Sequence, residues 1–359
     1  MSLIENIIRP DVRELDAYHV PDSAGYLKLD AMENPYRLPE DMQKRLGEHL
    51  AHVALNRYPV PSYTALKAKI REKLGVPDGY DVIVGNGSDE LIVIVSTALA
   101  RQDRRARVLA PVPTFVMYAL SARFAGLDFV GVPLKADFSL DMDAMLEAIR
   151  THRPSVLYLA YPNNPTGNLF DVKDMLALID AMKDTGIVIS DEAYQPFAQT
   201  SMMPYLPMHP NLVVMRTVSK LGLAGVRLGY MSASPELLAE FDKVRPPYNV
   251  NVLTEAAVEF ALDHIDVFNE QAASLRTERE NLSAALSTLP GITVLPSSAN
   301  FVLVRLENAD RVFEKLLARK VLIKNVGKMH ILLDNCLRIT IGTPEENRQF
   351  LDLFAACLR

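Results

Sequence analysis

The chain has 359 residues, of which 49% are hydrophobic and 23% are charged, the balance of a globular protein with material for two domains of roughly 100 to 200 residues each. A formal net charge of -6 gives no support to nucleic-acid binding, which usually shows a clustered basic face. The N-terminus carries charge within its first apolar patch, and the longest apolar run is too short to cross a bilayer, so we expect neither a signal peptide nor a membrane span and predict a cytoplasmic protein.

The first stretch, residues 4–34, is punctuated by proline and glycine and predicts an irregular arm leading into the body. After helices predicted at 39–54 and 63–74, short apolar segments begin to alternate with helical ones. Strands are predicted at 81–84, 107–110, 128–132, 156–160, 186–190, 212–215 and 228–231, and the helices between them at 89–100, 114–124, 141–151 and 172–184. Strands separated by helix-length crossovers predict an α/β fold with a mainly parallel seven-stranded sheet covered on both faces.

The pattern of predicted helices and strands changes in the last third of the chain. Ser234 and Pro235 predict the start of a helix that runs to about residue 244, and two long helical patterns follow at 253–263 and 265–288. Strands with fewer helices come next, at 293–295, 301–305, 321–324 and 337–341. We therefore predict three parts: an N-terminal arm that belongs to the small domain (1–45), a large α/β domain (46–246) and a small C-terminal α/β domain (247–359). Cys336 and Cys357 stand in no metal-ligand spacing, so no metal site or disulfide framework is predicted.

Ligands of an open parallel sheet bind beyond the carboxyl ends of its strands, so the residues that follow each strand are the first candidates for a site. Gly-Asn-Gly-Ser-Asp-Glu at 85–90 leads into a helix, where glycines and free N–H groups form a phosphate site. The alternative interpretation is that these glycines only allow the chain to turn and bind no phosphate. Tyr-Pro-Asn-Asn-Pro-Thr-Gly at 161–167 presents an amide at the next strand end, and a simple Asn-Pro turn explains only part of that pattern.

Asp191 directly follows a buried strand, where a carboxylate is costly to desolvate without a partner such as a pyridinium N–H. A helix cap is the alternative role for Asp191. Lys220 falls in a loop made irregular by glycines, with Arg227 as a permanent cation nearby. A desolvated lysine beside a cation can form Schiff bases with carbonyls, including that of pyridoxal phosphate. Taken alone, a solvated surface lysine is the better interpretation, because most lysines are exposed.

Over nearly its whole length the chain resembles the fold-type I pyridoxal-phosphate aminotransferases. The resemblance is carried by Pro-Asn-Asn-Pro-Thr-Gly, Asp-Glu-Ala-Tyr, and Ser-Lys followed by Gly-Leu-Ala-Gly-Val-Arg, in that order. It implies pyridoxal 5′-phosphate as cofactor of the large domain and Lys220, Asp191 and Tyr194 as catalytic residues. Lys220 would bind the cofactor covalently and move protons at the substrate Cα, and Asp191 would keep the pyridine nitrogen protonated.

The same resemblance assigns the remaining contacts of the cofactor. Asn164 and Tyr194 would hydrogen-bond the 3′ oxygen of the ring, and Phe115 would stack on the ring face. The phosphate would be held by Ser88, Asp89, Ser219 and Arg227, partly through backbone N–H groups.

Among these aminotransferases the chain most resembles the histidinol-phosphate aminotransferases. The shared stretches are Leu-Asp-Ala-Met-Glu-Asn-Pro at 29–35, where the family often has Asn in place of Met32, Asn-Arg-Tyr-Pro at 56–59, Gly-Ser-Asp-Glu at 87–90, and the stretches 321–325 and 337–346. The resemblance implies transamination of L-histidinol phosphate with 2-oxoglutarate, in histidine biosynthesis. It also implies a homodimer in which Tyr58 reaches the cofactor phosphate of the neighbouring subunit.

Arg338 alternates with apolar residues on a predicted strand, so its side chain shares a face with Thr340. A guanidinium there can pair bidentately with a carboxylate or phosphate of the substrate, and the alternative is a protective charge on an edge strand. Lys324 and Tyr18 are weaker candidates for the substrate site. The alternative functions are an aromatic or broad-specificity aminotransferase, a threonine-phosphate decarboxylase-like enzyme, and a non-catalytic binding protein on this fold. The complete set of cofactor residues argues against the last of these.

Overall fold

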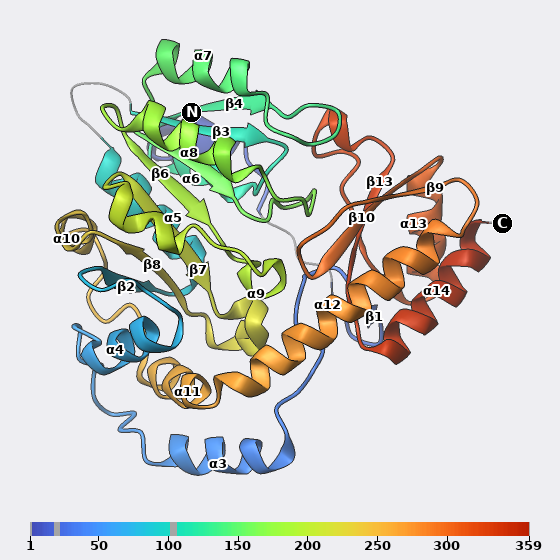
Figure 1. The fold of residues 1–359 in the computed structure, drawn as a ribbon, viewed down its shortest axis with the longest axis horizontal. Coiled ribbons are helices and arrows are strands. Elements are labelled where there is room, and N and C mark those ends of the chain that lie inside the picture. The colour runs from blue at the N-terminus through green and yellow to red at the C-terminus, as the bar shows by residue number, and fades with distance from the viewer. Residues whose placement is uncertain (1, 18–21, 101–105, 359) are drawn as a thin grey trace.

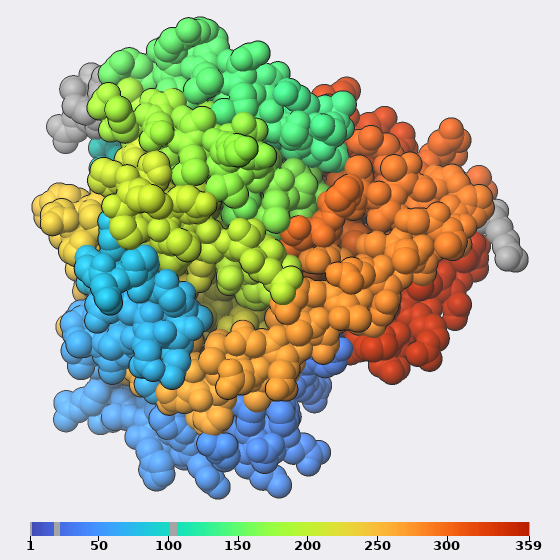
Figure 2. Space-filling model, in the orientation of Figure 1, coloured from blue at the N-terminus to red at the C-terminus, as the bar shows by residue number. Residues whose placement is uncertain are grey.

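The computed structural model describes residues 2–17, 22–100 and 106–358. Two bodies lie side by side, a larger one built on a seven-stranded sheet and a smaller one built on a four-stranded sheet (Figure 1). The long helix α12 (Ile265–Ser287) runs from one body to the other. In the space-filling view the two bodies meet along a continuous border (Figure 2), so residues from both can contribute to one site there.

The large sheet has the strand order β2-β8-β7-β6-β5-β3-β4. Its strands are β2 (Asp81–Gly85), β3 (Arg107–Val112), β4 (Asp128–Pro133), β5 (Val156–Ala160), β6 (Ile187–Asp191), β7 (Leu212–Thr217) and β8 (Gly229–Ala233). Strand β8 runs opposite to the other six strands, because the segment that joins it to β7 contains no crossover helix. The predicted mainly parallel seven-stranded sheet is confirmed.

Successive residues of each strand bury into opposite faces of this sheet. Leu157 and Leu159 belong to one hydrophobic core, whereas Val156 and Tyr158 belong to the other. The first core is covered by α4 (Thr64–Lys73), α7 (Met142–His152) and α8 (Val172–Met182), and the second by α5 (Gly87–Leu99), α6 (Met117–Phe124) and α10 (Pro235–Asp242). The helices α3 (Glu40–Ala51) and α11 (Val252–Asp263) pack together at the end of the large body (Figure 1).

The small body has an antiparallel sheet of order β12-β13-β10-β9, made by β12 (Lys324–Asn325), β13 (Cys336–Thr340), β10 (Phe301–Leu306) and β9 (Ile292–Leu295). Helices α12, α13 (Ala309–Ala318) and α14 (Pro344–Leu358) pack against one another and enclose a separate core. The N-terminal arm joins this body through β1 (Leu27–Lys28), which pairs in parallel with β11 (Val321–Leu322).

Several local predictions are wrong. The arm is not irregular throughout, since it contains α1 (Leu3–Ile7), α2 (Pro10–Arg13) and β1. The strand predicted at 321–324 is divided at Ile323 into β11 and β12, which belong to different sheets. Helices α13 and α14 were not predicted, nor was the short helix α9 (Gln195–Ala198). In the described part of the chain no helix is long and apolar enough to cross a membrane.

Candidate active site

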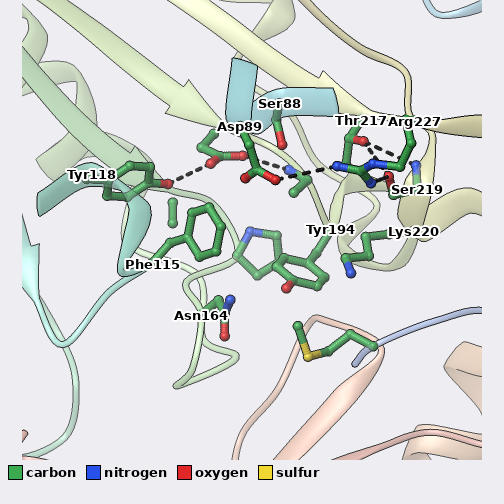
Figure 3. A pocket seen from close by; sticks show the side chains of 15 residues that line it. Ser88, Asp89, Phe115, Tyr118, Asn164, Tyr194, Thr217, Ser219, Lys220 and Arg227 are labelled. Carbon is green, nitrogen blue, oxygen red and sulfur yellow. Dashed lines mark hydrogen bonds and ion pairs between the residues drawn. The ribbon is translucent and has the colours of Figure 1, made fainter. Parts of the chain in front are cut away.

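A cavity of about 130 Å³ lies at the carboxyl ends of β5, β6 and β7, where Ala160, Asp191 and Thr217 are the last strand residues (Figure 3). The predicted cofactor residues that line it are Ser88, Asp89, Phe115, Asn164, Asp191, Tyr194, Ser219, Lys220 and Arg227. Residues predicted from separate stretches of sequence therefore come together in one place. Met32, from the N-terminal arm, also lines the cavity, and its backbone is hydrogen-bonded to Thr340 and Asn300 of the small body.

One end of the cavity is built from glycines that let Arg227 approach the start of α5. Gly87 has a φ of +79°, and a Cβ there would lie 2.5 Å from Nη2 of Arg227. A Cβ at Gly229 would lie 2.5 Å from the backbone nitrogen of Ser88. The guanidinium donates to Oγ of Ser219 at 3.3 Å and pairs with Oδ2 of Asp89 at 3.5 Å.

These groups match the requirements of a phosphate. The N-terminus of α5 presents backbone N–H groups and a favourable dipole, and Arg227 adds a charge-assisted donor. Asp89 contributes differently from the hydroxyls, because its carboxylate can hold Arg227 but cannot itself donate to an anion. Arg227 has a φ of 55°, a left-handed conformation that costs a non-glycine residue roughly 1 to 2 kcal/mol. In this conformation the guanidinium lies beside Gly87 and Ser219.

Asp191 lies deeper in the cavity and is 5% exposed. Its Oδ2 accepts a hydrogen bond from the hydroxyl of Tyr118 at 2.6 Å, and its Oδ1 accepts one from the backbone N–H of Ala193 at 3.2 Å. Burial raises the pKa of this carboxyl to about 6, and the Tyr118 hydroxyl opposes that rise. The alternative role as a helix cap is wrong, because Tyr194 occupies the N-cap position of α9. A buried carboxylate held by neutral donors suits a cationic N–H ligand.

Lys220 lies in a short helical turn, η2 (Ser219–Leu223), that is kinked at Gly222, and not in an irregular loop. Its side chain is half-buried, and Nζ donates to the carbonyl oxygen of Ala31 at 3.0 Å. Burial lowers the pKa of Lys220 to about 8, and the positive charge of Arg338 lowers it further. The solvated surface lysine is therefore the wrong interpretation, and the amine is poised to act as a nucleophile or base.

Arg338 lies one hydrogen bond behind the cavity wall. It is 7% exposed, and its Nη1 donates to Oδ1 of Asn164 at 2.6 Å. Its Nη2 donates to the carbonyl oxygen of Asp30 at 2.9 Å. The protective edge charge is ruled out, because β13 lies between β12 and β10. Arg338 thus links the arm, the small body and the Asn164 loop of the large body.

Two aromatic side chains complete the wall. Tyr194 is buried and packs edge-on against Phe301, with ring centroids 5.2 Å apart. Burial raises the pKa of the Tyr194 phenol, so its hydroxyl remains a hydrogen-bond donor at neutral pH. Phe115 packs edge-on against Tyr118, with centroids 5.7 Å apart, and presents its ring to the cavity.

Besides Arg338, two predicted residues of the described chain do not line the cavity, Tyr58 and Lys324. Tyr58 is 79% exposed and stacks on Tyr248, with ring centroids 4.6 Å apart. Lys324 is the cross-strand partner of Arg338 and shares its face of the small sheet, without lining the cavity. Tyr18 lies outside the described residues. The roles of all three remain predictions.

The cavity also contains residues to which the sequence assigned no role, notably Met32, Tyr118 and Thr217. Tyr118 follows Phe115 by three positions, and this helical spacing could have identified it as a neighbour in the site. The hydroxyl of Thr217 donates to the carbonyl oxygen of Leu228 at 3.0 Å and bonds Oγ of Ser219 at 3.0 Å. It thereby fixes the turn from which Lys220 projects.

The family model described as Aminotransferase class I and II matches residues 24–354. The chain is 61% identical to a histidinol-phosphate aminotransferase of Cupriavidus pinatubonensis, over 100% of this chain and 98% of that protein. It is also 61% identical to one of Ralstonia nicotianae, over 100% of this chain and 96% of that protein. The chain belongs to the histidinol-phosphate aminotransferases.

The fold is shared with a solved histidinol-phosphate aminotransferase of Sinorhizobium meliloti in complex with pyridoxal-5'-phosphate. The TM-score is 0.84 at 24% identity, over 98% of this chain and 96% of that chain. Pyridoxal 5′-phosphate is the cofactor of the present chain, and the cavity fits it at three points. Gly87 leaves space for Arg227 at the phosphate end, buried Asp191 suits the pyridinium, and the Lys220 amine suits the aldehyde.

Proposed function

We propose that this enzyme catalyses the reversible transamination of L-histidinol phosphate with 2-oxoglutarate, giving imidazole acetol phosphate and L-glutamate, in histidine biosynthesis. The observation that carries this choice of substrate is the 61% identity, over the whole chain, to histidinol-phosphate aminotransferases. The cavity supports the reaction class, because it gathers an amine, a buried carboxylate and an anion cradle around one space.

When bound, pyridoxal phosphate supplies a protonated aromatic ring that withdraws electrons and stabilises negative charge at the substrate Cα. Lys220 would attach the cofactor covalently and would transfer the Cα proton of the substrate. A pKa of about 8 favours both tasks, because a useful fraction of the amine is uncharged near neutral pH. Asp191 would hold the proton on the pyridine nitrogen.

Asn164 and Tyr194 would bind the 3′ oxygen of the ring. Because Oδ1 of Asn164 accepts from Arg338 at 2.6 Å, the amide is oriented with its Nδ2 donor free to turn toward that oxygen. Phe115 would stack on the ring face. The hydroxyls of Ser88 and Ser219, the guanidinium of Arg227 and backbone N–H groups near Asp89 would hold the phosphate.

Arg338 would bind the anionic groups of the two substrates, namely the carboxylate of glutamate and the phosphate ester of histidinol phosphate. A planar guanidinium suits both, since it offers parallel donors to two oxygens. Its hydrogen bonds to Asn164 and Asp30, from the large body and the arm, support this role. Lys324, on the same face, would add a second cation, and Tyr18 would add a hydroxyl.

The functional unit we propose is a homodimer in which Tyr58 reaches the cofactor phosphate of the second subunit. Tyr58 is 79% exposed within one chain and stacks on Tyr248, so the two rings form an exposed apolar surface. Leu3 and Ile7 of α1, 72% and 65% exposed, add further apolar surface that a second copy could cover. We also propose a cytoplasmic location. In place of a boundary after residue 246, we propose that the large domain extends to the end of α11, since Val258, Ala261 and Leu262 of that helix belong to its core.

Steady-state kinetics of the cofactor-loaded protein test the proposed substrate. With 2-oxoglutarate as amino acceptor, kcat/KM for histidinol phosphate should exceed that for phenylalanine, and Lys220→Ala should abolish glutamate formation from either donor. Similar values for the two donors would point to a broad-specificity aminotransferase, and release of carbon dioxide would point to a decarboxylase. Normal turnover by Lys220→Ala would remove the assigned role of the lysine.

A further inference from the structure

Tyr118 is held rigidly beside Asp191. Its hydroxyl donates to Oδ2 of Asp191 at 2.6 Å, and its ring is 1% exposed (Figure 3). One face of the ring stacks on Tyr158, with centroids 4.4 Å apart and an interplanar angle of 9°. Phe115 packs edge-on against it, with centroids 5.7 Å apart. The phenol oxygen therefore has little freedom to leave the carboxylate.

This contact favours the ionised form of the carboxylate. Asp191 is deeply buried, and burial disfavours the charged form of a carboxyl group, whereas a hydrogen bond from an O–H donor favours it. The donor is dependable, because burial raises the pKa of Tyr118 well above that of a free tyrosine and keeps its proton in place. With Tyr118 on Oδ2 and the N–H of Ala193 on Oδ1, both oxygens of Asp191 are oriented.

We propose that Tyr118 is a positioning residue that keeps the Asp191 carboxylate ionised and directed at the pyridinium nitrogen of the cofactor. The inference rests on the proposed function of the site, in which Asp191 holds the proton on that nitrogen. Tyr118 acts through Asp191: a neutral or rotated carboxyl group would no longer stabilise the ring as a cation. The cofactor would then bind more weakly and withdraw electrons less effectively.

The test replaces Tyr118 with Phe, which keeps the stacked ring and removes only the donor. Because a hydrogen bond to a charged group contributes strongly to binding free energy, equilibrium dialysis should show that Tyr118→Phe binds pyridoxal phosphate about 10 to 100-fold more weakly than the wild type. Tyr158→Phe is the matched control, since it removes the hydroxyl of the neighbouring stacked ring and leaves the bond from Tyr118 to Asp191 intact. We expect the affinity of Tyr158→Phe to equal that of the wild type.

The pH dependence gives a second readout. Without its donor, Asp191 should titrate above its pKa of about 6, so the midpoint at which cofactor affinity falls on acidification should move to higher pH in Tyr118→Phe. Tyr118→His, which restores a ring N–H near Asp191, should recover part of the lost affinity. An unchanged midpoint and wild-type affinity in Tyr118→Phe would overturn the proposal.

A double-mutant cycle separates positioning from a merely structural role. In an Asp191→Asn background the charged partner is absent, so Tyr118→Phe should cause no further loss of cofactor affinity. An equal loss in both backgrounds would show that Tyr118 only supports the fold and would overturn the proposal. Failure of the wild-type chain to bind the cofactor at all would instead refute the proposed function of the whole site.

Discussion

Replacing Gly87 with alanine is the most discriminating change at the phosphate end of the cavity. Gly87 has a φ of +79°, and the new Cβ would lie 2.5 Å from Nη2 and 3.2 Å from Cζ of Arg227. Those atoms form the far end of a flexible side chain, so the guanidinium can swing aside and the chain can still fold. The guanidinium would then leave the position at the start of α5 from which we propose that it binds the phosphate.

The expected magnitude has two separable parts. The left-handed backbone conformation costs a residue with a Cβ roughly 1 to 2 kcal/mol, which should appear as a lower free energy of unfolding. Loss of a charge-assisted hydrogen bond to the phosphate costs about 1.5 to 3 kcal/mol, which corresponds to pyridoxal phosphate bound about 10 to 100-fold more weakly. Gly126 offers a matched control, because its φ is +71° and a Cβ there would meet nothing within 4 Å.

Equilibrium dialysis of the cofactor and chemical denaturation of the cofactor-free protein measure the two parts independently. Gly87→Ala and Gly126→Ala should lose similar amounts of stability, whereas only Gly87→Ala should lose cofactor affinity. Equal cofactor affinity in the two variants would refute the placement of the phosphate beside Arg227.

Three further predictions concern the substrate site, the lysine and the buried core. Arg338→Ala should lower kcat/KM for both histidinol phosphate and 2-oxoglutarate, and an unchanged value for both would place the anion site elsewhere. Because burial lowers the pKa of Lys220 to about 8, the rate at which the cofactor-free protein captures pyridoxal phosphate should rise with pH up to about 8 and then level off; a continued rise to pH 10 in stopped-flow absorbance would contradict this. Glu192 is fully buried and pairs with Arg216 at 2.9 Å, so Glu192→Gln should lower the free energy of unfolding by about 3 to 5 kcal/mol. Glu240→Gln should leave the unfolding free energy nearly unchanged, since the pair of Glu240 with Lys243 is 64% and 65% exposed.

The sequence predicted the large sheet well because its strands are short apolar runs, a local signal that packing does not alter. The same property located Asp191, since a polar residue directly after such a run must lie at a strand end. Helices α13 and α14 were missed although their buried residues have helical spacing, as Phe350, Phe354 and Cys357 show. The strand pattern that dominates the preceding segment led to the prediction of too few helices there.

The partners within the site could not be read from the sequence. Tyr118 and Asp191 are 73 positions apart, and Asn164 and Arg338 are 174 apart. Which donor meets which acceptor depends on how the two bodies dock and how each side chain is packed, and no local pattern encodes those contacts. Residue types at strand ends identified the components of the site, whereas their hydrogen bonds required the folded structure.

The absorption spectrum of the cofactor-loaded protein, recorded without any keto acid, tests the central claim most directly. Addition of L-histidinol phosphate should remove the absorption band of the lysine-bound cofactor at a far lower concentration than addition of phenylalanine. Loss of the band with phenylalanine alone would contradict the proposed substrate while keeping an aminotransferase. Absence of any such band in the wild-type protein would contradict the assignment of Lys220 itself.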